Sequence, residues 1–534
     1  MGMSAKKLVL VINANQAYIR NLNSKTEFTN ENEVLFSAIT KTYIPLLNLF
    51  SQLESEGADF KISMVISSQL AELLNDAEIQ KQYENFLERA IKLGESEIKR
   101  TKGSECSELA KETLENFKKT KSDFTEKYGK NLTKAFASFA AKGLIELIPT
   151  AATYAYLPHF SDLEEAVNAQ VETGLYAQRQ FFGESGDGFF LPFMGFAPGL
   201  DRILRSYGMN YTLVDPRTVL FSNNACDTGI FRPVRSPSSL ILFPTDSQAL
   251  KLINGEEGFV ENEVYRSEFK DIGYELKAEE LKSFLGNSGV RSGTLYRYWK
   301  KGGDDPGEET EIYDPEEALE QVTEDAAVFT DSIKEKLSKA AELLPEKTVS
   351  DICVIPAELI GEKWHEGIIF LEKVIRSFCK DGEGVELDLC RNLLEDQLTL
   401  QKVDPFPSTG DDSGYGENLL DDSNSWMYRY IRKATERMTD LAERLPSETS
   451  LKGRLLNLAA KEILLAQSGQ WPLMLHEGKL TEYVKDTFKR HILSFTMIFN
   501  ALASNTVSTD WLTKKEKQDA IYPWMNYRIY SRKK

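Results

Sequence analysis

Seven short runs of apolar and β-branched residues, with helical stretches between most of them, limit the folds open to this chain. The runs are residues 7–13, 60–67, 144–148, 188–191, 211–214, 240–243 and 351–355. Short apolar runs of this kind are typical of buried strands. Parallel strands must be joined by crossover connections, which are usually helices. The alternation therefore predicts an α/β protein whose parallel sheet is either closed into a barrel or doubly wound.

Two further regions, residues 248–346 and the part of the chain beyond residue 425, have a helical pattern. Residues 248–346 lie between the sixth and seventh runs and include an acidic helix that begins after Asp314. Residues 405–425 are rich in Gly, Ser and Asp, which is typical of a loop. Beyond this loop, apolar residues recur every three or four positions in three amphipathic stripes. We expect a first domain at 1–405, with an insertion at about 248–346, and a C-terminal helical domain at 420–534.

The composition argues against several classes of partner. The formal net charge is −18, from 82 acidic and 64 basic residues, and such a field repels nucleic acid and anionic membrane surfaces. No apolar run approaches the ~20 residues of a membrane span. The five cysteines are widely spaced without a CxxC pair, which favours reduced thiols in the cytoplasm over a zinc site. No phosphate-binding or dinucleotide motif occurs, so we expect no cofactor.

The fourth run leads into GDGFFLPFMGFAPGL, residues 186–200, which reads as a strand, a sharp Gly/Pro turn and the start of a helix. Barrel and doubly wound enzymes place catalytic groups in such loops. The tip carries Phe193, Met194 and Phe196, and none of these side chains can act as an acid, a base or a nucleophile. The tip is therefore either a lost active site or a loop that was never one.

Three carboxyl groups lie on or just after predicted strands: Glu146, Asp215 and Glu358. Each suits either acid–base chemistry or a structural hydrogen bond. His365 follows the seventh strand and is the histidine best placed for a site. The four histidines have no metal-ligand spacing to one another, so we expect no metal site. The tryptophans suit either stacking on sugar rings or packing in a core.

Seven blocks, in order, resemble the family-57 glycoside hydrolases, and among them most closely the 1,4-α-glucan branching enzymes. They are NANQAYIR (13–20), IELIPTAATYAYLP (145–158), GFFLPFMGFAPGLDRIL (188–204), EEGFVENEVYRSEFKDIGYEL (256–276), AELIGEKWHEG (357–367), LLAQSGQWPLM (464–474) and YPWMNYRIY (522–530). The resemblance runs from Lys7 to Tyr530. It implies a (β/α)7 barrel with an inserted helical segment and a C-terminal all-α domain, which agrees with the strand and helix pattern.

The same resemblance implies that the catalytic groups are missing. The family is retaining and uses two carboxyl groups ~5–5.5 Å apart, one as nucleophile and one as acid/base. The family's nucleophile, a Glu after the Leu-Pro of the fourth strand, corresponds to Phe193, and its acid/base, an Asp after the seventh strand, corresponds to Pro356. Three family histidines correspond to Asn13, Asn15 and Tyr154, and tryptophans typical of branching enzymes correspond to Gly410, Gly416 and Leu419.

Eight residues could still line a groove: Tyr18, Arg20, Glu146, Tyr154, Asp215, Glu358, Trp364 and Trp471. All but Tyr154 fit the family pattern, and they either bind sugar or hold the barrel mouth together. The first hypothesis is a branching-enzyme-like pseudoenzyme that binds α-glucan, of the glycogen or amylose kind, or serves as a scaffold for a partner. The second is an active α-glucan enzyme that uses relocated carboxyl groups, Glu358, Glu146 and Asp215. The third is a protein-interaction module without sugar affinity, whose partner the sequence does not name.

Overall fold

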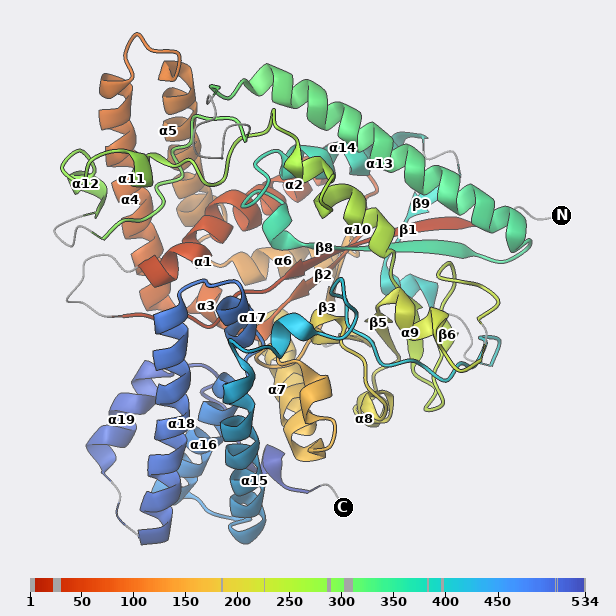
Figure 1. The fold of residues 1–534 in the computed structure, drawn as a ribbon, viewed down its shortest axis with the longest axis vertical. Coiled ribbons are helices and arrows are strands. Elements are labelled where there is room, and N and C mark those ends of the chain that lie inside the picture. The colour runs from red at the N-terminus through yellow and green to blue at the C-terminus, as the bar shows by residue number, and fades with distance from the viewer. Residues whose placement is uncertain are drawn as a thin grey trace.

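The computed structural model describes residues 5–22, 30–183, 186–224, 226–285, 290–301, 311–381, 384–394, 398–504, 506 and 508–532. Figure 1 shows a central group of strands surrounded by helices, with a separate group of helices, α15 to α19, on one side. The strands that build the centre are β1 (Lys6–Ala14), β2 (Ile62–Ile66), β3 (Ile145–Ile148), β4 (Gly188–Phe190), β5 (Tyr211–Val214), β7 (Ile241–Pro244) and β8 (Val349–Pro356). These are the seven predicted strands.

The seven strands follow one another around a barrel. One sheet has the order β3-β2-β1-β8, the other contains β4-β5-β7, and all these pairs are parallel. Backbone hydrogen bonds join the two sheets at both seams: Phe190 N to Pro149 O at 2.8 Å, and Asp246 N to Ile352 O at 2.8 Å. The predicted (β/α)7 barrel with a C-terminal helical domain is confirmed, and the doubly wound alternative is wrong.

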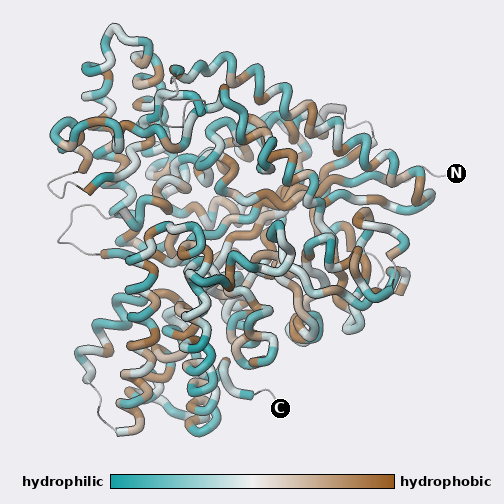
Figure 2. The backbone as a smooth tube through the Cα atoms, in the orientation of Figure 1, coloured by the Kyte–Doolittle hydropathy of each residue, from teal (hydrophilic) through white to brown (hydrophobic). Residues whose placement is uncertain are grey.

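Burial explains why these runs form strands. All five residues of β2, Ile-Ser-Met-Val-Ile, are buried, as expected where helices cover a parallel sheet on its outer side. Figure 2 shows the strands as the most continuously hydrophobic part of the chain. Two short strands were not predicted: β6 (Val234–Arg235), antiparallel to β7, and β9 (Val385–Leu387), parallel to β1. Two or three residues are too few to give a periodic signal.

Helices cover the barrel and account for most of the intervening chain. Their bounds are α1 Glu33–Ala38, α2 Ile44–Ser55, α3 Ser68–Asn75, α4 Ala77–Arg100, α5 Ser107–Ser122, α6 Leu132–Ala141, α7 Glu164–Phe182, α8 Leu200–Ser206, α9 Pro216–Leu220 and α14 Gly367–Asp381. A π-helical turn, Ile39–Tyr43, joins α1 to α2. Pro45 follows this turn and lacks the N–H that a regular helix would need, which gives a physical reason for the local widening.

One helical stretch, Glu33–Ser55, is long and apolar enough to cross a membrane, judged by length and composition alone. No membrane span was expected from the sequence. In this fold 67% of its most apolar 18-residue stretch is buried. The core helix of a globular protein can have the same length and composition. The apolar residues Leu46, Leu47 and Phe50 point into the main core.

The insertion contains α10 (Ser247–Asn254), α11 (Ile272–Glu275), α12 (Lys282–Leu285) and the long α13 (Pro315–Leu343). Asp314 caps α13 by accepting a hydrogen bond from Glu316 N at 2.9 Å, which is the role expected of an Asp before a first-turn Pro. The buried stripe of Val322, Phe329 and Ile333 packs α13 on the barrel, and Figure 1 shows the helix lying across it.

The C-terminal helices are α15 (Tyr428–Arg444), α16 (Ser450–Ala466), α17 (Gln470–His476), α18 (Thr481–Ser504) and α19 (Thr509–Gln518). The three predicted amphipathic stripes lie on α15, α16 and α18. These helices share apolar cores with the barrel, because Trp471 packs in one cluster with residues of α7 and α8. The domain limits at 405 and 420 stay a prediction.

Candidate functional site

A cavity of about 760 Å³ opens beside the carboxyl ends of the barrel strands. Asn13 near the end of β1, Phe193 after β4 and Pro356 at the end of β8 all line it. The first turn of α17 and the loop at residues 409–411 close one side, and the insertion closes another. This is the end of the barrel at which (β/α) enzymes hold their active sites.

The β4 loop reaches the cavity through a strained turn. Phe193 and Met194 both have left-handed backbones, with φ of 58° and 51°, which is unusual for residues with a side chain. The Phe193 ring lies edge-on to Tyr154, with ring centroids 5.0 Å apart. A Cβ at Gly469 would come within 2.5 Å of that ring, so α17 approaches Phe193 closely only because residue 469 is glycine. Phe193 is half-buried and forms an apolar part of the cavity wall.

Polar atoms without partners lie beside this apolar wall. Asn13 donates from Nδ2 to the Tyr154 hydroxyl at 2.6 Å, but its Oδ1 has no partner. Asn15 accepts from Gln69 at 3.0 Å, but its Nδ2 has no partner. Buried amide atoms are rarely left unsatisfied, so these two indicate a place for a polar ligand or water. Asn13, Asn15 and Tyr154, the three positions that the resemblance matches to family histidines, therefore all line the cavity.

Carboxyl groups are present in the cavity, although none stands at position 193 or 356. Glu358 is 52% exposed and pairs with Lys363 at 2.8 Å. Burial, with a contribution from the charge of Glu358, raises the pKa of the nearby Glu362 to about 8. Burial also raises the pKa of Glu33, across the cavity, to about 8. Glu33 and Glu362 are thus mostly protonated near neutral pH.

Of the eight candidate groove residues, Tyr154 and Glu358 line the cavity. Glu146 does not; its pKa is raised by burial, and inside the barrel it accepts hydrogen bonds from Tyr211 Oη at 2.5 Å and Ser63 Oγ at 2.9 Å. Arg391 N also donates to it, at 3.2 Å. Glu146 therefore joins β2, β3 and β5 through their interior faces.

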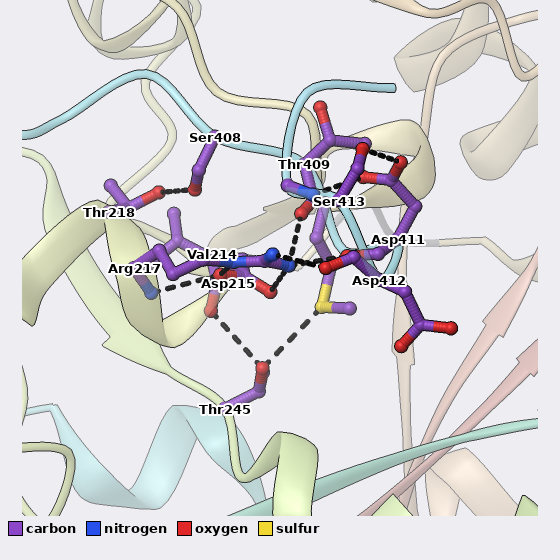
Figure 3. A network of polar contacts seen from close by, with 12 residues as sticks. Val214, Asp215, Arg217, Thr218, Thr245, Ser408, Thr409, Asp411, Asp412 and Ser413 are labelled. Atoms are coloured by element: carbon purple, nitrogen blue, oxygen red, sulfur yellow. Dashed lines mark hydrogen bonds and ion pairs between the residues drawn. The ribbon is translucent and has the colours of Figure 1, made fainter. Parts of the chain in front are cut away.

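Asp215 also stays outside the cavity lining. Its carboxylate, 2% exposed, forms a two-pronged pair with Arg217: Oδ1 to Nε at 2.7 Å and Oδ2 to Nη2 at 3.0 Å. Figure 3 shows the guanidinium of Arg217 between this carboxylate and the 409–412 loop. Arg217 donates to Thr409 O and Asp412 O, both at 2.9 Å. The pair therefore fastens one cavity-lining loop to the end of β5.

The remaining four candidates are part of the protein's framework. Tyr18 is buried, and Arg20 pairs with Asp76 at 2.6 Å. Trp364 is 1% exposed, and Trp471, fully buried, donates from Nε1 to Leu465 O at 2.8 Å. None of the four lines the cavity.

The positions that the resemblance matches to family tryptophans carry no aromatic side chain. Gly410 lines the cavity, and a Cβ there would lie 2.4 Å from Met194 Cε. Gly416 has a φ of 70° and lies against the Tyr156 hydroxyl, and Leu419 is fully buried. The aromatic rings at the cavity rim come instead from the insertion: Phe269, 71% exposed, and Tyr274, 58% exposed. Both rings lie within the block at residues 256–276, but neither was predicted to have a role, because exposure has no local sequence signal.

Among the residues that the structure describes, Glu462, His491 and Asp519 form one group close enough to share a metal ion. Arg490 already donates to both oxygens of Asp519, at 2.8 and 3.0 Å, and His491 Nδ1 lies 2.6 Å from Glu462 Oε2. This contact joins α18 to α16.

Replacing Glu33 with glutamine is expected to flatten the pH dependence of stability. The raised pKa means that the folded protein holds a proton that the unfolded chain releases, so this carboxyl group lowers stability as pH rises from about 4.5 towards about 8. The loss is at most about 1.4 kcal/mol per pH unit. Between about pH 6 and about pH 9, the melting temperature of Glu33→Gln should rise relative to that of the wild type. Glu342→Gln, on the exposed face of α13, is the control. Parallel curves for Glu33→Gln and wild type would contradict the assignment.

Comparison with known proteins shows that the chain is similar to α-glucan enzymes. Residues 9–347 match glycosyl hydrolase family 57, and residues 430–530 match the C-terminal domain of 1,4-alpha-glucan branching enzymes. The chain is 26% identical over 522 residues to the 1,4-alpha-glucan branching enzyme of Thermococcus kodakarensis, covering 94% of this chain and 74% of that protein.

Solved structures agree with this match. The alpha-amylase AmyC of Thermotoga maritima superposes with a TM-score of 0.91 at 27% identity, over 99% of this chain and 100% of that one. The family-57 branching enzyme of Pyrococcus horikoshii has the same fold, with a TM-score of 0.85 at 22% identity over 99% and 97% of the two chains. The resemblance inferred from the sequence blocks is confirmed for the family and for the likeness to branching enzymes.

Proposed function

Since the chain belongs to glycosyl hydrolase family 57, we propose that it is a branching-enzyme-like pseudoenzyme that binds α-glucan at the barrel mouth without cleaving it. The proposal separates two properties that an active relative combines. One is a cavity able to hold a chain of sugar rings, and the other is a pair of carboxyl groups able to open a glycosidic bond.

The expected replacement of both family carboxyl groups carries the proposal. By the resemblance of the surrounding blocks, Phe193 stands where the family has its nucleophile and Pro356 where it has its acid/base. Both residues line the same cavity, so the positions face one shared space. A phenyl ring cannot attack an anomeric carbon, and proline cannot donate a proton to a leaving oxygen.

Binding of α-glucan is supported by the chemistry of the cavity. Its volume of about 760 Å³ is that of a small-molecule site. Asn13 and Asn15 offer unpartnered amide atoms, which suit sugar hydroxyls. Phe269 and Tyr274 present exposed rings at the rim, where a sugar ring could lie against an aromatic face.

An active enzyme with relocated carboxyl groups is the second candidate. Glu358 and Glu362 both line the cavity, and the raised pKa of Glu362 suits a proton donor. Glu146 and Asp215, the other carboxyl groups considered for this role, are held by hydrogen bonds outside the lining. Of the three carboxyl groups named from the sequence, the alternative therefore keeps only Glu358, with Glu362 as a further acid of the lining.

Affinity electrophoresis in gels that contain glycogen or amylose tests the binding. Wild-type protein should be retarded, and the Phe269→Ala, Tyr274→Ala double variant should bind about tenfold more weakly, because each lost aromatic contact is worth about 0.5–1.5 kcal/mol. Phe221→Ala is the matched control, since Phe221 is 59% exposed but does not line the cavity.

Unretarded migration of the wild-type protein would count against glucan binding and favour the third candidate, an interaction module without sugar affinity.

The cytoplasm is the proposed location, because the five cysteines are all free thiols.

A further inference from the structure

Carboxyl groups outnumber cationic groups on the wall of the barrel-mouth cavity. The lining has six carboxyl groups, those of Glu33, Glu268, Glu358, Glu362, Asp411 and Glu477, and three cationic side chains, those of Arg297, Lys363 and Lys479. Ion pairs already occupy all three cations: Lys363–Glu358 at 2.8 Å, Lys479–Glu477 at 3.0 Å and Arg297–Asp271 at 3.5 Å. The remaining acids of the lining are therefore not offset by its cations.

Glu33, Glu268 and Glu362 are the acids of the lining that this leaves over. None of the three has an ion-pair partner among the residues that the structure describes. Asp411 differs from them, because it accepts hydrogen bonds from Ser413 Oγ at 2.7 Å and Gly414 N at 3.1 Å within its own turn. Burial raises the pKa of all three, to about 8 for Glu33 and for Glu362. Carboxyl groups held neutral in this way ionise when a positive charge comes beside them.

The charged neighbours of Glu33 and Glu362 do not supply that positive charge. Those that act on Glu33 are Asp271 and Arg297, and those that act on Glu362 are Glu358, Lys363, Arg297 and Lys479. The cations among these neighbours are the ones already paired with acids. Burial therefore prevails at both carboxyl groups.

Exposed aromatic rings at the cavity rim accompany two of the three acids. Phe269, which is 71% exposed, follows Glu268 directly in the chain, and both line the cavity. Tyr274, which is 58% exposed, lies on the part of the insertion that Glu33 approaches. The face of an aromatic ring attracts an ammonium group, and a carboxylate pairs with it. Rings and carboxyl groups together suit a ligand that carries ammonium groups.

The approach of Glu33 to the insertion is fixed by the backbone there. A Cβ at Gly293 would lie 2.6 Å from Glu33 Oε1 and 3.7 Å from Asp271 Oδ2. Asp271 is the cap of α11, the short helix that carries Tyr274. Glu33, from α1, therefore reaches the cavity wall at the base of the helix with the exposed tyrosine.

One metal ion does not account for these acids. Among the described residues, the group close enough to share an ion is Glu462, His491 and Asp519, far along the chain in the C-terminal helices. Glu33, Glu268 and Glu362 are not close enough to one another to do so. They suit separate positive charges, such as those of amino groups on successive sugar rings.

We propose that the barrel-mouth cavity binds a glucan-type chain that carries free amino groups, with Glu33, Glu268 and Glu362 as its ammonium-binding residues. The inference rests on the proposed function, because it takes the cavity to be a sugar-binding site. It adds a preference for positively charged chains over neutral ones. Sugar phosphates and uronic acids are disfavoured, since their charge has the same sign as that of the ionised lining.

Isothermal titration calorimetry tests the preference with three chains: maltoheptaose, its 6-amino-6-deoxy derivative, and the N-acetylated form of that derivative. Salt at about 0.15 M screens the net charge of the protein at long range. At about pH 7 the aminated chain should bind about tenfold or more tightly than maltoheptaose, as expected for charged hydrogen bonds. N-acetylation removes the charge and should abolish this gain.

Proton release distinguishes binding at these carboxyl groups from general attraction. An ammonium group stabilises the ionised forms of Glu33 and Glu362, so the aminated chain should release protons on binding near neutral pH, and maltoheptaose should release none. Binding enthalpies in two buffers with different heats of ionisation measure the release. For the same reason, affinity for the aminated chain should rise between about pH 6 and about pH 8.

Three single variants locate the preference. In Glu33→Gln and Glu362→Gln the amide resembles the protonated carboxyl group, and each should lower the preference for the aminated chain by about threefold to tenfold and reduce proton release. Glu268→Gln, at a partly exposed position, should also lower the preference and decides the test if the other two do not fold. Glu342→Gln removes the same charge from the exposed face of α13 and should behave as the wild type does.

The outcomes separate this inference from the proposed function. Binding of maltoheptaose with no gain for the aminated chain would overturn the inference and leave glucan binding intact. So would a gain that Glu33→Gln, Glu268→Gln and Glu362→Gln all retain. A gain in a protein that does not bind maltoheptaose would support the inference and contradict binding of neutral glucan. Binding of neither chain would overturn both.

Discussion

Replacing Arg217 with methionine is expected to destabilise the protein by about 3 kcal/mol, because it leaves a buried carboxylate without its partner. Asp215 is 2% exposed and receives both prongs of the guanidinium. The same guanidinium holds the 409–412 loop through the carbonyl oxygens of Thr409 and Asp412 (Figure 3). Loss of Arg217 should therefore lower global stability and loosen one wall of the cavity. Urea unfolding measures the first effect, and hydrogen exchange of residues 405–420 measures the second.

Two variants make this prediction specific. Arg202→Met removes an exposed pair with Glu164, whose side chains are 63% and 51% exposed, and should cost less than about 1 kcal/mol. The double variant Asp215→Asn, Arg217→Met removes the unpaired charge and should recover part of the loss. If the double variant were no more stable than Arg217→Met, the buried charge would not be the cause.

The strands of the barrel could be predicted because their signal is local. The centre of the first run, Leu8–Ile12, is apolar throughout, as expected of a strand covered on its outer face by helices. Whether the sheet closes or stays open depends on the two seams, at Phe190 and Asp246, which are short contacts with no sequence pattern of their own. From the sequence, only the family resemblance favoured a closed barrel over a doubly wound sheet.

The site residues were harder to predict, because the role of a side chain depends on what packs against it. Trp364 and Trp471 were candidates for the groove, but a core ring and a sugar-binding ring have the same side chain. Asp215 ends a strand as a catalytic acid would, and Arg217, two residues later, was the available sign that it is neutralised instead. The exposed rings of Phe269 and Tyr274 depend on how the insertion packs, which no single segment determines.

The largest expected effect concerns catalysis. Wild-type protein incubated with amylose should form no branch points and release no reducing ends. Acid–base catalysis alone contributes about 10²–10⁴-fold to such rates, and without a nucleophile the covalent intermediate of a retaining enzyme cannot form. Phe193 and Pro356 supply neither group. The carboxyl groups of the lining, Glu358 and Glu362 among them, stand at other positions, and Glu358 is paired with Lys363.

The most direct test is an assay of branch-point formation and reducing ends on amylose with purified wild-type protein. The Glu358→Gln, Glu362→Gln double variant serves as the blank, and an active family-57 branching enzyme as the positive control. The account predicts that wild type and double variant give the same signal, at the level of buffer alone. Reproducible turnover by the wild type that is absent from the double variant would contradict it and would assign catalysis to the relocated carboxyl groups.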